Sequence, residues 1–565
     1  MYFSSYKRLL VVLFLLIVGG YAAPSFRRKT LGQGAVASNG KECAEMGAAI
    51  LKQRGSVADA AITTLLCEGI TCPQSTGLGG GFHMTIYIKN RNFVECLDAR
   101  EVAPKNAYET MFVNDTKKSS LEGGLSIAVP GELKGMWELH QKYGKLPWSK
   151  LFEPVIKLCR EGHEVTEYLA RVLRIKEKDI KEIPSIREVF VNPETGEIWN
   201  AGDKIKRLAL ADTLEVISKD GADTIYKMGK IGRQLLDDIK DFGGILTEED
   251  FTDYKVKWVK PAEATLKGEQ KLYSMPLTGS GAVLVFIMNL LKGFDLKKDT
   301  LSYHRIIESY KLAYARRSEL ADPDFVESAK ILVQNMTDPN FADLMRKKIN
   351  NTRSFDNIEY YGGHFVSEED HGTAHISILA PNGDAISATG TINYILGSLR
   401  RSKTGIILND EMDDFSTPGS VNVYGIPPSE ANFIRPGKRP MSSMAPTIIV
   451  NKHGDVDMVI GSAGGSRITT AIANTIINYY FFNSEESLWN TFAQKRLHHQ
   501  LIPNKLYFED GFDDEIIKEL NSTYRHSIEM VTQSIGFGAL VGIYVDEDSV
   551  QSAYDPRRGG SSVVF

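Results

Sequence analysis

The chain has 565 residues, of which 42% are hydrophobic and 24% charged, and its formal net charge is −5. This composition is typical of a globular protein, and the mixed charge signs with a slight acidic excess argue against a nucleic-acid-binding protein. Length alone would allow three or four domains, yet no internal repeat, low-complexity segment or Pro/Gly/Ser-rich linker divides the chain.

The N-terminus predicts a secretory signal peptide over residues 1–23. Lys7 and Arg8 precede a continuous apolar run from Leu9 to Val18, and small residues follow as far as Ala23. The run is shorter than the about 20 apolar residues that span a bilayer. We therefore expect a secreted, extracellular protein, with a signal anchor that holds it at the cell surface as the alternative. Four Asn-X-Thr triplets support the secretory route as glycosylation acceptors: Asn114, Asn335, Asn350 and Asn521.

Helical periodicity dominates the first two thirds of the chain, with helices predicted near 41–54, 57–69, 131–143, 206–218 and 302–317. Within this part, Gly77-Leu-Gly-Gly-Gly-Phe82 resembles a dinucleotide loop, but Phe82 occupies the position of its last glycine. It also precedes a predicted strand (83–89) instead of following one. No Cys-X-X-Cys pair or His-Glu-X-X-His motif occurs, so we expect neither a metal nor another cofactor.

Strand patterns are concentrated in the last third, and two of them form a predicted hairpin. Residues 374–380 and 385–392 alternate apolar with small or polar side chains, and Asn382-Gly383 between them is a strong turn signal. Pairing about this turn places Thr391 next to Thr373. Further strands are predicted at 446–451, 455–461 and 538–546, and a helix at 467–480.

Thr373 is the most informative residue of the hairpin because Gly372 precedes it. A threonine at the start of a strand is often only a β-branched residue that suits a sheet. Cleavage of the Gly372–Thr373 bond, however, would give Thr373 a free α-amine beside its own hydroxyl, the pairing used by N-terminal threonine nucleophiles. The acidic residues 368–370 predict an exposed segment just before this bond.

The sequence closely resembles the γ-glutamyltransferase (γ-glutamyltranspeptidase) family from about residue 33 to near its end. Seven ordered motifs carry the resemblance: Gly77–Gly81, Leu97–Pro104, Thr373–His375, Ser387–Asn393, Asn409–Phe415, Arg435–Pro446 and Gly461–Ser466. The family implies an α+β N-terminal-nucleophile hydrolase fold, a four-layer αββα sandwich. It also implies a precursor that cuts itself into a large subunit (24–372) and a small subunit (373–565), which remain together as a heterodimer.

The resemblance also implies the roles of individual residues. Thr373 would be the nucleophile of self-cleavage and of catalysis, Thr391 would orient it, and Gly464-Gly465 would supply oxyanion donors. Arg100, Ser442 and Ser443 would bind the carboxylate of a γ-glutamyl substrate, and Asn393, Glu411 and Asp414 its ammonium. His375 and His498 fall where the family carries histidines, but we expect structural roles for them.

The expected activity is cleavage of the γ-glutamyl bond of glutathione and its conjugates, with transfer of the glutamyl group to water or to an amino acid or dipeptide. Two alternatives stay open: a secreted, catalytically impaired relative that acts as a binding or effector protein, and an enzyme specialised for another γ-glutamyl or acyl substrate. Gly390, where many relatives have serine, and the C-terminal residues 561–565 depart from the family pattern. Cys43 and Cys67 match a disulfide pair of animal members, which leaves Cys72, Cys96 and Cys159 unassigned.

Overall fold

The computed structural model describes residues 32–365, 372–420, 427–531, 537–547 and 549–565. The predicted signal peptide (1–23) and the acidic segment 368–370 lie outside the described residues. Within the described part of the chain, no helix has the length and apolar character needed to cross a bilayer.

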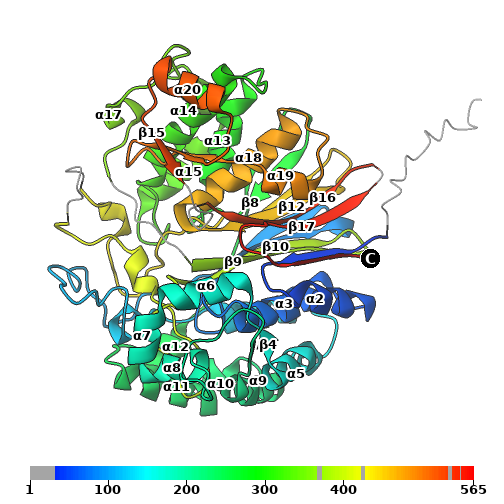
Figure 1. Ribbon diagram of the computed structural model, residues 1–565, viewed down its shortest axis with the longest axis vertical. Helices are drawn as coiled ribbons and strands as arrows, with labels where there is room; N and C mark the ends of the chain where they lie inside the picture. Colours follow the sequence, from blue (N-terminus) through cyan, green and yellow to red (C-terminus); the bar gives the residue numbers. More distant parts are fainter. Residues whose placement is uncertain (1–31, 366–371, 421–426, 532–536, 548) are drawn as a thin grey trace, which may run out of the picture.

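Two large sheets are stacked face to face in the centre of the molecule (Figure 1). The first has seven strands, in the order β18 (Ser561–Val564), β1 (Ala35–Ser38), β9 (Gly372–Leu379), β10 (Ala385–Asn393), β2 (Gly81–Ile88), β3 (Phe93–Ala99) and β6 (Lys257–Val259). The second has six, in the order β17 (Val550–Tyr554), β16 (Ala539–Val545), β12 (Val456–Ala463), β11 (Thr447–Val450), β8 (Lys271–Ser274) and β7 (Ala262–Thr265). Two small sheets, β13 (Leu497–His498), β14 (Leu506–Glu509), β15 (Ile528–Val531) and β4 (His163–Glu164), β5 (Lys204–Ile205), lie apart from them.

Helices cover the outer face of each large sheet, which gives four layers (Figure 1). On the seven-stranded sheet lie α2 (Cys43–Lys52), α3 (Val57–Thr71), α4 (Glu132–Tyr143), α5 (Glu153–Glu161), α6 (Glu167–Ile175), α7 (Glu177–Glu182), α8 (Pro184–Phe190), α9 (Leu208–Asp220), α10 (Asp223–Tyr226), α11 (Lys230–Asp241) and α12 (Glu248–Asp253). On the other side lie α13 (Gly281–Lys292), α14 (Thr300–Arg317), α15 (Glu327–Thr337), α16 (Pro339–Arg346), α17 (Ile358–Tyr361), α18 (Ile468–Tyr480), α19 (Leu488–Ala493) and α20 (Asp514–Ser522).

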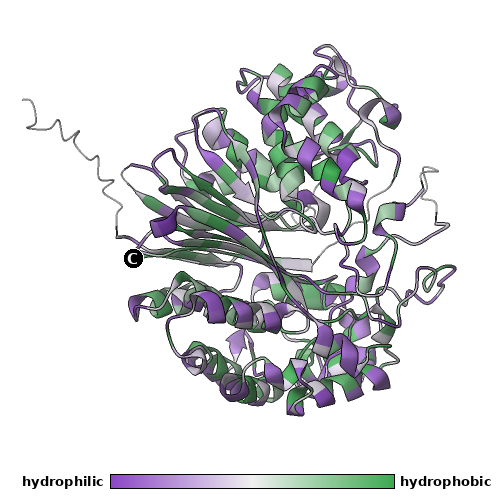
Figure 2. Ribbon diagram, turned by 180° about the vertical axis from the view of Figure 1, so that it is seen from behind, coloured by the Kyte–Doolittle hydropathy of each residue, from purple (hydrophilic) through white to green (hydrophobic). Residues whose placement is uncertain are grey.

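Apolar side chains hold these layers together. The strands carry the hydrophobic residues of the centre, while the outer helices turn hydrophilic residues to solvent (Figure 2). Between the sheets, Tyr87 and Leu379 pack against Ile448, Val459 and Ile543. Burial of such side chains stabilises the fold by about 1.5–3 kcal/mol each, so the sheets are fixed against one another and the residues between them are positioned rigidly.

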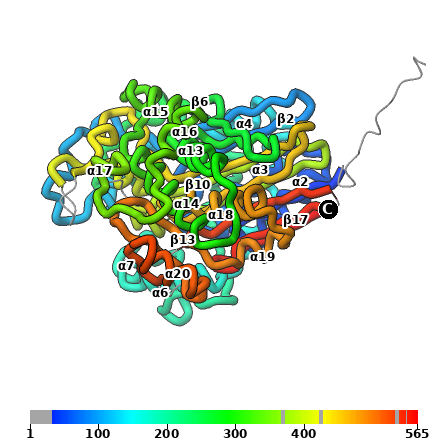
Figure 3. The backbone as a smooth tube through the Cα atoms, turned by 90° about the horizontal axis from the view of Figure 1, so that it is seen from above, coloured from blue at the N-terminus to red at the C-terminus, as the bar shows by residue number. Residues whose placement is uncertain are grey.

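A local signal explains why α3, one of the predicted helices, begins where it does. Before α3, Ser56 accepts a hydrogen bond from the Asp59 amide at 3.1 Å, and the Asp59 carboxylate accepts one from the Ser56 amide at 2.8 Å. This reciprocal capping box satisfies amides that a helix start leaves unpaired. The first and last described strands, β1 and β18, are neighbours, so both ends of the described chain lie at one side of the molecule (Figure 3).

The predicted hairpin is confirmed: β9 and β10 pair antiparallel around a turn in which Gly383 has φ +86°. The expectation that strands concentrate in the last third is wrong. Six strands of the two large sheets precede Thr373 in the chain: β1, β2, β3, β6, β7 and β8. β1 and β2 are buried at every residue and so lack the alternation of a half-exposed strand, and β7 and β8 have only four residues each, which makes their alternation a weak signal in the sequence.

Candidate active site

The Gly372–Thr373 bond lies at the start of β9, in the interior of the molecule. Thr373 is 1% exposed, and its hydroxyl donates a hydrogen bond to the Gly372 carbonyl oxygen at 2.5 Å. The Thr391 hydroxyl donates to the same oxygen. The backbone amide of Asn393 donates to Thr391 Oγ1 at 2.8 Å and so directs that hydroxyl. Two hydroxyl groups therefore converge on the carbonyl of the bond that the sequence marks for cleavage.

Gly372 fills a space in which no side chain fits. A Cβ atom there would lie 2.3 Å from the carbonyl oxygen of Asn393, which is backbone and cannot move aside. The crowding comes from an irregularity in the hairpin: Gly390 pairs with Ala374, but the next partner of β9 is Asn393, opposite Gly372. Such a bulge bends its strand, and it brings Thr391 to the scissile carbonyl.

The glycine-rich loop 77–81 allows close backbone packing. A Cβ on Gly79 would lie 1.9 Å from the Ile407 carbonyl oxygen, and one on Gly80 would lie 1.9 Å from that of Thr391. The loop therefore packs directly beside the strand that carries Thr391. Close backbone packing therefore explains why the loop is rich in glycine, without any role in binding phosphate.

Arg100 lies at the centre of a second, charged group. It follows the last residue of β3, is completely buried, and forms ion pairs with Glu411 and Asp414. Glu411 and Asp414 are the ends of one short 3₁₀ turn, so both carboxylates reach the same guanidinium. The guanidinium also donates to the carbonyl oxygen of Met441 at 3.3 Å.

Ser442 and Ser443 follow Met441 directly, so the structure places them beside the Arg100 group. The amide of Ser442 donates to the Thr278 carbonyl at 2.9 Å, and the Ser443 hydroxyl accepts a hydrogen bond from Arg317 at 2.8 Å. Both serines are buried.

Asn393 connects the scissile bond to the charged group. Its side-chain amide donates to the carbonyl oxygen of Asp410 at 3.1 Å, one residue before Glu411, while its backbone amide holds Thr391. Its φ of +70° lies in the left-handed region that asparagine tolerates better than most residues. The chain of contacts from Thr391 through Asn393 to Glu411 therefore brings the predicted nucleophile and the predicted substrate-binding residues into one site.

Burial dominates the electrostatics of this site. It raises the pKa of Glu101, which adjoins Arg100, to about 8. It also raises the pKa of Asp410 well above the ordinary range. For Asp98, burial acts in the same direction, but Arg439 and His83 more than offset it and hold the pKa of that carboxyl below its usual value.

Gly464 and Gly465 begin the turn between β12 and α18, with φ values of +123° and +61°. A Cβ on Gly464 would lie 2.7 Å from Gly538 Cα, so this position requires glycine. The strand that precedes this turn, β12, packs against the β9–β10 hairpin. The Ser387 hydroxyl, opposite Ser377, donates to the Ile460 carbonyl at 2.9 Å, and the His375 ring lies against Gly461. Ile460 thus lies near the Ser377–Ser387 pair, and Gly461, the next residue of β12, lies against His375. The chain of β12 therefore runs toward the end of β9 that begins with Thr373.

The two histidines of the motifs are enclosed by hydroxyl and amide groups. His375 Nδ1 bonds the Thr389 hydroxyl at 2.7 Å and Nε2 the Ser377 hydroxyl at 3.1 Å. His498 bonds Thr470 at 2.8 Å and Gln500 at 2.9 Å. Burial lowers the pKa of both rings to about 3, so both are neutral at pH 7. These contacts support the structural roles expected from the sequence.

Sequence reasoning missed Arg558, whose guanidinium donates to the Thr373 carbonyl oxygen. It also donates to the Ser75 hydroxyl at 2.8 Å and to the Tyr168 hydroxyl at 2.9 Å. The run Asp-Pro-Arg-Arg-Gly-Gly at 555–560 was the available signal. Arg558, Tyr168 and Arg171 line a hollow of about 1080 Å³, so Arg558 connects the nucleophile strand to a cavity large enough for a small molecule.

The structure joins Cys43 to Cys67 by a disulfide of 2.01 Å between α2 and α3, and Cys72, Cys96 and Cys159 are buried free thiols. Three of the four predicted glycosylation sites, Asn114, Asn335 and Asn521, are exposed and Asn350 is half-buried.

Comparisons with known proteins agree with this geometry. The family model described as gamma-glutamyltranspeptidase matches residues 43–565. Scoloptoxin SSD14 of Scolopendra dehaani is 43% identical, covering 99% of this chain and 99% of the relative. Glutathione hydrolase proenzyme 1 of Schizosaccharomyces pombe is 37% identical, covering 94% of this chain and 84% of the relative. Among solved structures, cephalosporin acylase from Bacillus halodurans superposes with a TM-score of 0.80 at 23% identity, covering 96% of this chain and 98% of the other. This likeness shows the N-terminal-nucleophile hydrolase fold, which confirms the expected α+β sandwich.

Proposed function

The chain belongs to the γ-glutamyltranspeptidase family, and from this premise we propose that it is a γ-glutamyltransferase and glutathione hydrolase. It would cleave the γ-glutamyl bond of glutathione and its conjugates and transfer the glutamyl group to water, an amino acid or a dipeptide. The observation that carries the proposal is the convergence of the Thr373 and Thr391 hydroxyls on the Gly372 carbonyl oxygen.

Self-cleavage would come first. The Thr373 hydroxyl attacks the Gly372 carbonyl carbon, and the Thr391 hydroxyl stabilises the negative charge that develops on the carbonyl oxygen. Collapse breaks the C–N bond as the departing nitrogen takes up the proton of the hydroxyl, and it leaves an ester between Gly372 and the Thr373 side chain. Water then hydrolyses this ester, which frees the carboxylate of a large subunit (24–372) and the α-amine of a small subunit (373–565). The two chains form the heterodimer.

In catalysis the freed amine acts as the base. It accepts the hydroxyl proton while the Thr373 oxygen attacks the γ-carbonyl of the substrate, and Gly464 and Gly465 donate backbone hydrogen bonds to the oxyanion. The amide nitrogen of the leaving group takes up a proton and departs. Water or an acceptor amine then resolves the γ-glutamyl-threonine ester, which predicts ping-pong kinetics.

Substrate binding would exchange one set of ion pairs for another. Arg100 is balanced by Glu411 and Asp414 in this structure. A γ-glutamyl group brings a carboxylate for Arg100 and an ammonium for the two acids, with Ser442, Ser443 and Asn393 as further hydrogen-bonding partners. No buried charge is left without a counter-charge, and this limits the cost of desolvation.

The test is to compare the wild-type protein with Thr373→Ala and Thr373→Ser on denaturing gels and with a chromogenic γ-glutamyl anilide. Thr373→Ala removes the nucleophile, so we expect one uncut chain without turnover. Thr373→Ser keeps a hydroxyl and an α-amine, so we expect cleavage and measurable turnover. Wild-type protein that is fully active as one unbroken chain would refute the proposal.

A secreted or cell-surface location belongs to the same proposal. It is supported by the charged and apolar N-terminal pattern, by the Cys43–Cys67 disulfide, which suits an oxidising compartment, and by the exposed Asn-X-Thr sites. N-terminal sequencing of the mature chains would distinguish a cleaved signal peptide from a retained anchor.

A second candidate, an effector protein with impaired catalysis, is favoured by one observation: the 43% identical relative is named a scoloptoxin. The complete set of nucleophile, oxyanion and charged residues favours the enzyme. Turnover of γ-glutamyl anilide by the processed protein would exclude the impaired alternative. Its absence despite cleavage at Thr373 would favour it.

A further inference from the structure

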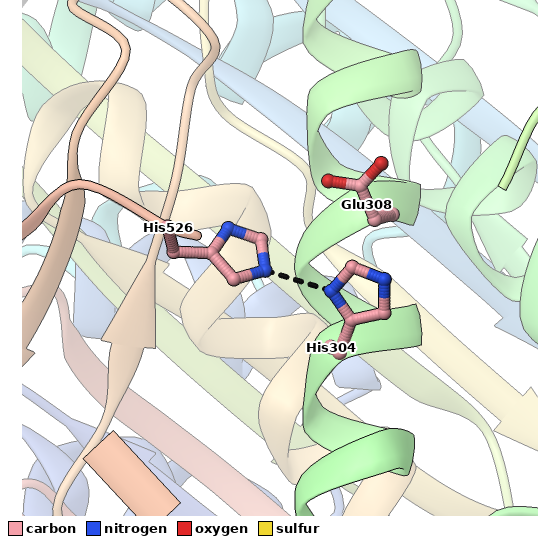
Figure 4. A group of neighbouring side chains, drawn as sticks. All are labelled: His304, Glu308 and His526. Atoms are coloured by element: carbon pink, nitrogen blue, oxygen red, sulfur yellow. Dashed lines mark hydrogen bonds between the residues drawn. The ribbon is translucent and has the colours of Figure 1, made fainter. Parts of the chain in front are cut away.

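Three metal-binding side chains meet outside the active site, where the sequence predicted no metal. His304 and Glu308 lie one turn apart on α14, and His526 comes from the segment between α20 and β15 (Figure 4). One ligand atom from each residue lies within 4.8 Å of the other two. We propose that His304, Glu308 and His526 form a structural site for a transition-metal ion of the zinc class, which ties α14 to the segment before β15.

The two rings face each other through their nitrogen atoms. His304 Nδ1 lies 2.8 Å from His526 Nε2, and His304 Nε2 donates to the Asn350 carbonyl oxygen at 2.7 Å. Because Nε2 carries the hydrogen of His304, the lone pair of Nδ1 points toward His526. Metal-ligating histidines almost always donate their other N–H to a carbonyl or carboxylate in this way.

The Glu308 carboxylate is also oriented by hydrogen bonds from residues that are not part of the proposed metal site. Its Oε1 accepts a hydrogen bond from Ser354 at 2.7 Å, and its Oε2 accepts one from Tyr361 at 2.8 Å. A carboxylate has about four lone-pair positions, so these bonds leave capacity for a metal. The backbone of His526 is held as well, since Asn521 Nδ2 donates to its carbonyl oxygen at 2.8 Å.

The donor set selects the class of ion. Two imidazoles and one carboxylate suit zinc and its neighbours in the first transition row, whereas calcium and magnesium prefer oxygen ligands alone. Lys311 Nζ lies 3.8 Å from Glu308 Oε1, so binding of any cation must overcome repulsion from this ammonium group. All three ligands are at most 2% exposed, so bulk solvent would not compete with them for the ion, while one of the four tetrahedral positions has no ligand within this cluster.

Only small movements are needed to admit the ion. Ligand nitrogens of a tetrahedral zinc ion lie about 3.3 Å apart. The two imidazole nitrogens, now 2.8 Å apart, would therefore separate by roughly 0.5 Å, and the carboxylate oxygen, within 4.8 Å of them, would move closer by at most about 1.5 Å. Rotation of side chains within their wells covers such distances.

His304 and Glu308 precede Thr373 in the chain and His526 follows it, so the ion would connect the two subunits after self-cleavage. This consequence depends on the proposed function, whereas metal binding itself does not. The test therefore measures metal content and stability, without activity.

The experiment compares tag-free wild-type protein with His526→Gln and His163→Gln. The glutamine at 526 can still donate an amide hydrogen bond to His304 Nδ1, but it is a poor ligand for zinc. His163 is likewise a completely buried histidine, on β4 and outside the cluster, so its variant is the matched control. Each protein is stripped with a chelator, incubated with zinc, dialysed, and measured by mass spectrometry of the metal and by thermal unfolding.

We expect about one bound zinc ion per chain in the wild type and His163→Gln, and a more than tenfold lower content in His526→Gln. Zinc should raise the unfolding temperature of the wild type and of His163→Gln by roughly 2 °C, and it should leave that of His526→Gln unchanged. A zinc-free wild type after loading, or an equal zinc content in His526→Gln, would show that the rings form only a hydrogen bond. Should His526→Gln fail to fold by circular dichroism, Glu308→Gln and anomalous diffraction at the zinc edge decide the same question.

Discussion

At the scale of single residues, the atoms around position 372 explain why this residue is a glycine. Its carbonyl oxygen accepts hydrogen bonds from two threonines, and the space for a side chain is occupied by the Asn393 carbonyl. A glycine is thus required by close approach of the backbone, before any role in cleavage is considered. The same position serves structure and the proposed chemistry together.

Arg100 is the second residue on which the proposal depends, and its geometry gives a prediction. Arg100→Lys keeps the buried charge but loses the planar fork that reaches two partners. We expect the KM for a γ-glutamyl donor to rise about 10- to 100-fold, with a smaller change in kcat, corresponding to roughly 1.4–2.8 kcal/mol of binding. Steady-state kinetics with γ-glutamyl anilide would measure this.

The matched control is Arg439→Lys. Arg439 is also a buried arginine, paired with Asp98 at 3.3 Å, but it is not among the predicted substrate-binding residues. Both variants should lose similar stability, and only Arg100→Lys should change KM strongly. Equal effects on KM would contradict the assignment of Arg100.

At the scale of elements, the bulge in β10 and the turn after β12 determine the geometry of the candidate active site. The sequence predicted the β9–β10 hairpin because its turn residues and alternation are local signals. It did not predict the bulge between Gly390 and Asn393, because a bulge depends on what packs against the strand. That packing is the glycine loop 79–81, which is distant in sequence from β10.

Gly464→Ala tests the turn after β12. The φ of +123° and the approach of Gly538 exclude a side chain, so the turn must shift and misdirect the proposed oxyanion donors. Loss of one such donor lowers kcat by about 100- to 1000-fold in proteases, and we expect a decrease of this order in single-turnover rates. Gly196→Ala is the control: its φ of +74° is also left-handed, but nothing lies within 4 Å of its added Cβ. An equal loss of rate in both variants would rule out a specific role for Gly464.

His375, between the two sheets, gives a prediction about pH. Burial lowers its pKa to about 3 in the folded protein, whereas an unfolded histidine titrates near 6.5. Below pH 6.5 the unfolded chain therefore binds a proton that the folded chain does not, and stability falls as the pH decreases toward 3.

In His375→Gln, the slope of unfolding free energy against pH between 4 and 6 should be smaller by about 1.4 kcal/mol per pH unit. Urea unfolding at several pH values would measure the slope. His453→Gln, which removes an exposed histidine, is the control. An unchanged slope in His375→Gln would mean that the ring is protonated in the folded protein as readily as in the unfolded chain.

At the scale of the whole molecule, both large sheets combine strands from either side of the Gly372–Thr373 bond. In the seven-stranded sheet, β1 lies between β18 and β9, and β10 pairs with β2. In the six-stranded sheet, β11 pairs with β8. A cut at Gly372 breaks one covalent bond and leaves every one of these ladders intact.

We therefore predict that the two chains stay together after cleavage. Size-exclusion chromatography under native conditions should give one species of about the mass of the uncut chain, 62.8 kDa, minus any signal peptide. A denaturing gel of the same fraction should show two bands. The uncut Thr373→Ala variant, expected to elute at the same volume, is the reference. Fragments that separate without denaturant would contradict the shared sheets.

The sequence by itself predicted the nucleophile, and it determined the hairpin that carries this residue, the family and the fold class. These depend on local signals and on motifs whose residues are contiguous, such as Asn382-Gly383 and Gly464-Gly465. The tertiary structure alone decided that Arg558 holds the Thr373 carbonyl, that Asn393 connects Thr391 to Asp410, and that His304 meets His526. The physical reason is distance along the chain: His304 and His526 are 222 residues apart, and only the packing of helices and sheets brings such residues into contact.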